Sequence, residues 1–302
     1  MSIVHALKDE EVSDHDRRRS LFSGEIFVYT PRHSTVSFAG ASLRFIESSL
    51  GPDAIWAQQR MPESDFVTRF GVAARILSKV VLELASGVVT DFGCDPETTF
   101  IGAPALAAVT GQGFLAHGLG IPQHPHRDTW YAASPYQVHW LIPLHDLDSS
   151  AVFAFHPMYW DLPVRNSSRD FDYEEWQAQN RMGYVGGRSV GPLDQPRSLG
   201  PIDLSSELRI SCPAGGVILS SAAQLYSAGP NETLKTHFSV HFQTLSQRDI
   251  ENGVGAWNLD AEPDGTSLPN FVRCSDMSPI PEDLVRTALE HRAASPPVES
   301  KS

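Results

Sequence analysis

The stretch from His124 to Pro157 reads HPHRDTWYAASPYQVHWLIPLHDLDSSAVFAFHP. It holds two apolar runs, QVHWLIP and AVFAFH, on either side of the acidic, serine-containing segment HDLDSS. Runs of β-branched and aromatic residues bounded by turn-forming residues are typical of β-strands. The stretch therefore predicts a strand, a turn and a second strand.

Runs of the same kind occur on both sides of this stretch. They are separated by Gly, Pro, Asp and Ser, a spacing typical of an antiparallel β barrel or jelly roll rather than of βαβ units. The sequence therefore predicts a mainly β fold with flanking helices. The predicted strands are 25–30, 98–101, 105–110, 114–118, 137–143, 151–156, 208–211, 216–220 and 235–245.

One long segment has helical periodicity instead. From 65 to 85, apolar residues recur at three- and four-residue spacing, Ser64 can cap the N-terminus, and Gly87 follows the end. Such a helix is expected to lie against the sheet with one face buried. Shorter helices are predicted at 36–50, 53–59 and 282–291.

The remaining segments predict one domain with flexible ends. Residues 1–18 are charged and poor in apolar side chains, which predicts an N-terminal arm, and the domain is expected to run from 19 to 292. Residues 293–302, AASPPVESKS, predict a disordered tail. Between 160 and 204 lies an aromatic, Gly- and Pro-rich insertion that is too long for a simple connection and predicts a lid.

The composition narrows the class of partner. The 302 residues include 23 Lys and Arg against 36 Asp and Glu, a net charge of −13, with no basic run. Nucleic acid and anionic membranes are therefore poor partners, and a small-molecule substrate is expected. Three widely spaced cysteines fit reduced thiols, and no apolar run reaches the roughly 18 residues that span a bilayer. A cytoplasmic protein is expected.

Histidine is enriched, with 12 in the chain and six of these between 117 and 156. If the segment QHPHRDTWY is extended, residues two apart share a face, so His124, His126, Asp128 and Trp130 would point the same way. Two imidazoles and a carboxylate suit iron, zinc or copper. A histidine bonded to an aspartate near a turn is also common, so the triplet alone leaves both interpretations open.

Three motifs around this segment resemble one enzyme family. They are HPHRDTWYAASPYQVHWLIPL, the turn HDLDSS with AVFAFHP, and FHPMYWDLPVRN at 155–166. Together they resemble iron(II)/2-oxoglutarate-dependent oxygenases of the phytanoyl-CoA hydroxylase-like group. The resemblance implies a double-stranded β-helix (jelly roll, cupin-like) and an Fe(II) ion held by His126 and Asp128. His124 is then an extra imidazole that either orients these ligands or lies at the edge of the site.

The same resemblance identifies positions where this chain departs from the family. The turn Gly229-Pro230-Asn231 aligns Tyr226 with the distal histidine ligand and His237 with the arginine that grips 2-oxoglutarate. Ser239 is kept from the family's Arg-x-Ser element, while Gln243 stands at a second basic position. One metal ligand and the carboxylate clamp are therefore both replaced.

These replacements change the chemistry that the family site can support. A tyrosine such as Tyr226 binds metals as the phenolate, which favours a ferric or cupric ion, and its ordinary pKa is about 10. Histidine cannot place two parallel donors on a carboxylate, which argues against 2-oxoglutarate. Since His237 and His241 share a strand face, one of them can complete a metal site with His126 and Asp128. Alternatively, His126 and Asp128 form a metal-free base and its orienting group.

Other residues near these motifs are candidates for substrate contact. Arg165, in the PVRN element, is the expected anion partner, and its alternative role is a loop salt bridge. His139, His145 and His156 are expected to be structural. The candidate substrate-binding residues are His124, Trp130, Tyr131, Arg165 and His241; the candidate catalytic residues are Tyr226 and His237; the candidate metal ligands are His126, Asp128 and Tyr226; the candidate cosubstrate-binding residues are His237 and Ser239.

Three functions follow in this order. The first is a non-haem, metal-dependent oxygenase (a dioxygenase-like oxidoreductase) acting on a small specialised metabolite, with iron as cofactor. The second is a repurposed enzyme on the same fold, a cyclase, lyase or isomerase that uses histidine and tyrosine as acid and base. The third is a non-catalytic binding protein.

Overall fold

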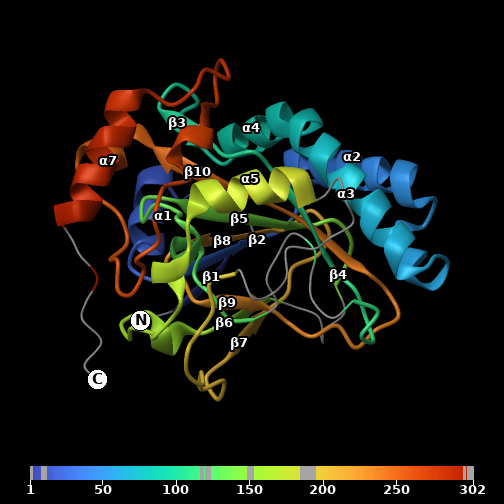
Figure 1. The fold of residues 1–302 in the computed structure, drawn as a ribbon. Coiled ribbons are helices and arrows are strands. Elements are labelled where there is room, and N and C mark those ends of the chain that lie inside the picture. The colour runs from blue at the N-terminus through green and yellow to red at the C-terminus, as the bar shows by residue number, and fades with distance from the viewer. Residues whose placement is uncertain are drawn as a thin grey trace.

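The computed structural model describes residues 3–7, 12–115, 119, 124–147, 153–183, 195–294 and 297, without the side chains of 7 and 179–183. Helices, a large sheet and a small sheet lie in successive layers (Figure 1). The predicted combination of sheets with flanking helices is thus present, in a mixed helix-and-sheet architecture. The finer jelly-roll topology stays a prediction.

The large sheet contains eight strands, and all its pairings are antiparallel except that of the first two. It positions the central strands of the site side by side. In spatial order the strands are β1 (Val4–Leu7), β2 (Ile26–Tyr29), β8 (Val217–Ser221), β5 (Val138–Pro143), β10 (His237–Ser246), β3 (Thr99–Ile101) and β11 (Val272–Arg273), with β4 (Ala105–Val109) also paired to β10.

The small sheet has three antiparallel strands, in the order β7 (Leu208–Ile210), β6 (Phe153–Phe155) and β9 (Tyr226–Ala228). Eight of the nine predicted strands overlap described strands closely, including the one at 25–30, which matches β2. The prediction at 114–118 is wrong for 114–115, which form a bend, while 116–118 lie outside the described residues. The short strand β9 was not predicted, because Ser227 and Ala228 give it no strand-like apolar run.

The bounds of the helices are α1 (Asp14–Leu21), α2 (His33–Leu50), η1 (Ala54–Gln59), α3 (Glu63–Val80), α4 (Leu82–Asp91), η2 (Asp128–Tyr131), α5 (Tyr173–Gly183), α6 (Gln247–Glu251) and α7 (Glu282–Ala294). The helices α2, α3 and α4 pack against one face of the large sheet, and the other helices lie elsewhere around it.

The alternation of side chains along β5 and β10 separates two apolar layers. Trp140, Phe238 and Phe242 point toward α2 and α3 and join the main core. Leu141 points the other way and packs with Phe153 of the small sheet. Because strand neighbours alternate between faces, the histidines of β5 and β10 lie on the side of the small sheet. The predicted common face of His237, Ser239, His241 and Gln243 agrees with this alternation.

The predicted helix at 65–85 is wrong in its bounds. Two helices, α3 and α4, meet at Val81, whose φ of −99° and ψ of 2° interrupt the first helix. Val81 is buried, so the apolar periodicity continues across the break and does not reveal it. Pro62 rather than Ser64 precedes the first turn, and Gly87 lies inside α4.

The expected N-terminal arm also differs from the structure. The strand β1 pairs in parallel with β2, with Val4 opposite Ile26. In α1, Arg17 is buried against Asp14, and Arg18 bonds Asp249 at 2.5 Å. Charged residues of the predicted arm are thus paired within the fold. Of the expected tail at 293–302, only 293, 294 and 297 are described.

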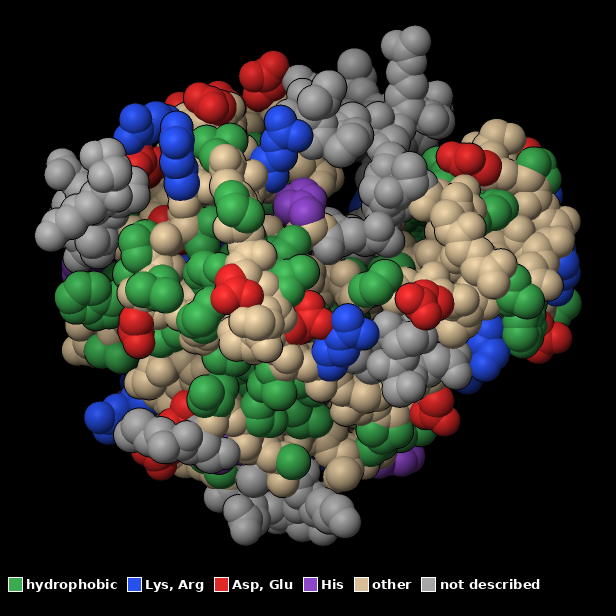
Figure 2. All heavy atoms as spheres, turned by 90° about the horizontal axis from the view of Figure 1, so that it is seen from below, with side chains coloured by type: hydrophobic (Ala, Val, Ile, Leu, Met, Phe, Trp, Pro, Cys, Tyr) green, Lys and Arg blue, Asp and Glu red, His purple; other side chains and the backbone are tan. Residues whose placement is uncertain are grey.

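The described surface mixes charged and apolar side chains (Figure 2), and the cysteines are reduced, as the sequence predicts. On the face seen in Figure 2, acidic and basic side chains are scattered among apolar ones. Cys94, Cys212 and Cys274 are buried and free of disulfides. Across the described ranges, no helix combines the length and apolar character that a membrane span requires.

Candidate functional site

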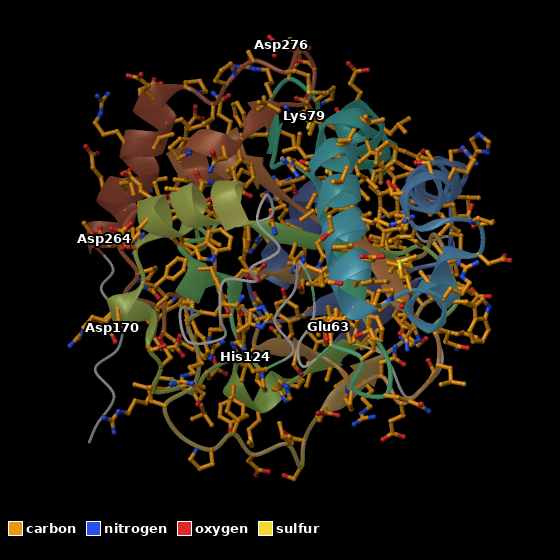
Figure 3. All side chains as sticks on the ribbon, turned by 45° about the vertical axis from the view of Figure 1, so that its right-hand side comes forward. Glu63, Lys79, His124, Asp170, Asp264 and Asp276 are labelled. Atoms are coloured by element: carbon orange, nitrogen blue, oxygen red, sulfur yellow. The ribbon has the colours of Figure 1, made fainter. Side chains whose placement is uncertain are left out.

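A cavity of about 480 Å³ opens between the large sheet and the helices α3 and α5. Its polar floor comes from three segments far apart in the sequence: the stretch 126–128, β5 with β10, and the start of β9. The walls are α3, which extends between Glu63 and Lys79 in Figure 3, and the first turns of α5. The predicted insertion at 160–204 therefore reaches the cavity through Tyr173 and Trp176, while its residues 184–194 lie outside the described part.

The segment that carries the His-x-Asp motif is only partly extended. His126 exchanges both backbone hydrogen bonds with Tyr226, each 2.9 Å long, which fixes the motif against β9. From Asp128 the chain turns into the 3-10 helix η2. The prediction that His124, His126, Asp128 and Trp130 share one strand face is therefore wrong, because the alternation ends at Arg127.

Asp128 is the centre of the polar floor. Its Oδ1 accepts a hydrogen bond of 2.9 Å from the Tyr226 hydroxyl, and its Oδ2 lies 3.3 Å from Nδ1 of His139. The same Oδ1 lies 3.7 Å from Nε2 of His126, too far for a hydrogen bond. Three side chains thus converge on one carboxyl group that lines the cavity.

The contacts continue from His139 along β10. Nε2 of His139 lies 3.1 Å from Nδ1 of His241, and Nε2 of His241 lies 2.8 Å from the Ser239 hydroxyl. Because an ionised carboxylate only accepts, the attractive arrangement has Nδ1–H of His139 facing Asp128. His139 then accepts from Nδ1–H of His241, which accepts from Ser239. In this arrangement each donor lies on the side toward Asp128, whose Oδ2 is buried without a hydrogen bond among the described residues.

The two ring nitrogens of His126 differ in their protonation, and the one that faces Asp128 carries no proton. Its Nδ1 lies 3.0 Å from the carbonyl oxygen of His124, which can only accept, so Nδ1 carries the proton. In the neutral ring, Nε2 is then a bare lone pair that faces Asp128 across 3.7 Å. Two acceptors facing each other leave room for a proton donor or a cation between them.

Burial decides the protonation of these groups. It lowers the pKa of His126 to about 4, with the Asp128 carboxylate opposing the shift. Burial likewise lowers the pKa of His139, and holds that of His241 well below its usual value. Burial together with Asp128 raises the pKa of Tyr226 well above 10. At neutral pH the three imidazoles are therefore uncharged and the phenol keeps its proton.

Among the predicted substrate contacts, Tyr131 and His241 line the cavity, whereas Trp130 and Arg165 do not. Trp130 is fully buried in a separate cluster and donates its indole N–H to Asp260 at 2.7 Å. The side chain of Arg165 is exposed to solvent. These two predictions are corrected: η2 turns Trp130 away from the cavity, and Arg165 lies exposed on the segment between residues 160 and 167.

His124 stands at the edge of the site. Its ring lies 3.0 Å from the carbonyl oxygen of Pro196, and its backbone rather than its imidazole orients His126.

The predicted position of the 2-oxoglutarate clamp lies apart from the cavity. His237 and Ser239 line a different space of about 10 Å³, which is about the size of one water molecule. His241 and Gln243 of the same strand line the main cavity instead. The residues at the predicted clamp position, His237 and Ser239, therefore do not fit 2-oxoglutarate beside Asp128, since neither lines the space next to that carboxylate.

The metal prediction fits in part. His126 offers its lone pair and Asp128 its carboxylate, and the third predicted ligand, Tyr226, lies beside them with its hydroxyl on Asp128. The raised pKa of Tyr226 opposes the phenolate that a metal needs. Within the described residues, no group of three or more His, Cys, Asp or Glu side chains is arranged to hold a metal ion.

The sequence reasoning missed two components. His139 was expected to be structural, yet it contacts Asp128 and lines the cavity; its alternation with Trp140 on a buried strand was the available signal. Asp260 gave no sequence signal. It binds the buried guanidinium of Arg127 at 3.1 Å and the backbone N–H of Val164 at 2.8 Å, and so fixes the segment next to Asp128.

Comparison with known proteins gives distant matches only. No family model matches the sequence, and no curated protein matches it. EvdO2 from Micromonospora carbonacea var. aurantiaca, solved with 2-oxoglutarate, is 12% identical over 58% of this chain and 64% of its own, with a TM-score of 0.39. This chain thus spans less than two thirds of EvdO2.

Two further solved structures align over more of the chain. The epimerase SnoN, in complex with Fe3+, alpha ketoglutarate and nogalamycin RO, is 13% identical over 77% of this chain and 83% of its own, with a TM-score of 0.41. The non-heme monooxygenase ThoJ is 13% identical over 86% and 87%, with a TM-score of 0.40. Sequence identities and TM-scores this low indicate only a remote similarity.

Proposed function

We propose that this chain is an enzyme that transfers protons on a small organic substrate in the cavity beside Asp128. The reaction class is an isomerisation, elimination or cyclisation without net oxidation. The observation that supports it is the bare Nε2 of His126. This residue lines the cavity, and the His124 carbonyl oxygen holds the proton of its ring on Nδ1. At neutral pH this imidazole is uncharged and free to accept a proton, and its pKa of about 4 makes it a weak base suited to an acidic C–H or O–H bond.

Each neighbour then has a role in this reaction. His126 takes a proton from a C–H or O–H bond of the substrate, and the electron pair moves to a conjugated oxygen. The imidazolium that forms is stabilised by Asp128 at 3.7 Å. The hydroxyl of Tyr226 can turn from Asp128 to the developing oxyanion, since it stays protonated. The proton returns from His126 at another position or leaves with a departing group.

His139 and His241 support Asp128 in this proposal. Nδ1 of His139 lies 3.3 Å from Oδ2 of Asp128, the oxygen that does not face His126, and Nε2 of His139 lies 3.1 Å from Nδ1 of His241. Oδ2 has no hydrogen bond among the described residues, so the neighbouring N–H of His139 can move onto it when Tyr226 turns away, and the buried charge keeps a donor. We therefore assign the two histidines a positioning role.

The experiment measures isotope incorporation. Purified protein, treated with a chelator, is incubated in D₂O with a mixture of small aromatic and β-dicarbonyl acids, and products are read by mass spectrometry. We expect mass-neutral conversion or deuterium uptake that needs no oxygen. The variant His126→Asn should abolish it, because asparagine keeps a donor for the His124 carbonyl and removes the Nε2 lone pair. Products heavier by one oxygen atom, formed only with added iron and air, would contradict the proposal.

A second candidate is the metal-dependent oxygenase of the phytanoyl-CoA hydroxylase-like group. It is favoured by the facing acceptors of His126 and Asp128, which suit a cation as well as a proton donor. His126, Asp128 and an ionised Tyr226 would hold the metal, which would supply dioxygen binding when present. It stands second because Tyr226 is held protonated and the clamp position at His237 is outside the cavity.

A further inference from the structure

The wall of the cavity opposite the polar floor is built by one face of α3. Gly71, Ala74, Arg75 and Ser78 line the cavity at spacings of three and four residues, which places them on one side of the helix. Three of these side chains are small, so the helix leaves space there instead of filling it. The fourth, Arg75, is exposed at the cavity.

Arg75 is the one Lys or Arg among the described residues that line this cavity. In the described part of the chain, it has no hydrogen bond or ion pair. This contrasts with Arg17, Arg18 and Arg127, whose guanidiniums are each bonded to a carboxylate. In a chain of net charge −13, a cation without an acidic neighbour is available to an anion from outside.

A second donor on the opposite wall also lacks an acceptor. The indole N–H of Trp176 in α5 is buried and has no hydrogen-bond partner among the described residues. Trp176 lines the same cavity. The centroid of its ring lies 6.0 Å from that of the Tyr173 ring and 5.9 Å from that of the Phe171 ring. A buried N–H without an acceptor is unfavourable, so a ligand oxygen at this position is favoured.

We infer that the substrate is an organic acid with a planar, apolar body. Its carboxylate binds Arg75, a second oxygen accepts from the Trp176 N–H, and its flat body packs on Tyr173 and Trp176. The opposite end then reaches Asp128 and His126, where the reaction takes place. This inference rests on the proposed function for the reaction, but the charge preference belongs to the cavity walls and can be measured without turnover.

The experiment compares two probes of the same shape by calorimetry. They are 2-naphthoate, which is anionic, and 2-naphthamide, which is neutral. Wild-type protein should bind the anion about tenfold more tightly, a typical effect of one charge-assisted contact. In Arg75→Gln the two probes should bind within about twofold of each other, while Arg75→Lys should keep part of the preference. Trp176→Phe should weaken both probes, since it removes the N–H and keeps a ring.

The matched control is Arg69→Gln. Arg69 lies on the same helix, is exposed and does not line the cavity, so this variant changes the net charge equally. It should leave the preference unchanged. The inference is overturned if wild type binds both probes equally, if neither binds at millimolar concentration, or if the Arg69 and Arg75 variants behave alike.

The experiments distinguish a failure of the proposed function from a failure of this inference. If His126→Asn keeps deuterium incorporation while the preference for 2-naphthoate depends on Arg75, the acid–base proposal is wrong and the anion site stands. If His126→Asn abolishes incorporation but Arg75→Gln does not change the preference, only the anion site is wrong. Thermal unfolding of each variant checks that it is folded.

Discussion

The Nδ1 of His126 lies 3.0 Å from the carbonyl oxygen of His124, two residues earlier in the chain, and this contact determines which nitrogen carries the proton. The same conclusion follows for His139 and His241 from their positions between Asp128 and Ser239. All three imidazoles are therefore neutral and protonated at Nδ1, although they come from three different segments.

The first prediction concerns these tautomers. Two-bond ¹H–¹⁵N correlation spectra at neutral pH should show His126, His139 and His241 protonated at Nδ1, with Nε2 at the shift of an unprotonated nitrogen. The exposed His33 provides a reference ring without these contacts. A proton on Nε2 of His139 would reverse the donor direction and contradict the positioning role assigned to that residue.

The second prediction concerns stability against pH. The folded chain holds the pKa of His126 at about 4, against an ordinary 6.5, so the unfolded chain binds a proton first as the pH falls. The free energy of unfolding should therefore be highest above pH 6.5 and decrease by up to about 3 kcal/mol toward pH 4. His139 and His241 shift in the same direction and add to the loss.

Urea unfolding of wild type and His126→Asn between pH 7.5 and 4.5 tests this dependence. The variant lacks the titrating ring, so the difference between the two curves isolates its contribution. The difference should shrink as the pH decreases through the window from 6.5 to 4. Parallel curves would show that the buried ring is not the source of the acid sensitivity.

Much of the fold could be predicted because strand signals are local. The runs that became β5 and β10 combine β-branched and aromatic residues with turn residues at their ends, and the structure places both strands within a few residues of the prediction. The break at Val81 could not be predicted, because buried apolar residues continue across it. The pairing of β1 depends on contacts with Ile26 that no local pattern shows.

Residues of the site could be predicted only where they belong to a sequence motif. His126, Asp128 and Tyr226 were identified from the motif and its resemblance, and the structure brings them together. The error at Trp130 arose because alternation was continued past Asp128, where the backbone turns into η2. His139 was passed over because its partner is 11 residues away along the chain and its role depends on tertiary packing.

The third prediction restores the family ligand. Tyr226→His should add a nitrogen donor beside His126 and Asp128 and complete a set of two imidazoles and one carboxylate. Binding of Co(II), measured anaerobically by calorimetry and visible absorption, should become at least about tenfold tighter than in wild type. Such a gain would mean that the side chain at position 226 limits metal affinity, and that the geometry of His126 and Asp128 does not.

Tyr226→Phe is the control for this substitution. It removes the same hydroxyl from Asp128 but adds no donor, so Co(II) affinity should not increase. If the histidine and phenylalanine variants bind Co(II) equally, the backbone of β9 does not present residue 226 to a metal. The alignment of Tyr226 with the distal ligand would then be incorrect.

The fourth prediction tests the support behind Asp128. Asp260 and Arg127 form an ion pair with both side chains nearly inaccessible, and Asp260 also accepts from the indole of Trp130. Asp260→Asn should leave the guanidinium without a counter-charge and lower the free energy of unfolding by about 3–5 kcal/mol. Glu262→Gln, which breaks the exposed pair with Arg169, should cost less than about 1 kcal/mol.

Urea unfolding of both variants measures the difference. Equal losses would mean that Arg127 is stabilised by its three carbonyl contacts alone, and that Asp260 does not hold the segment that carries Asp128.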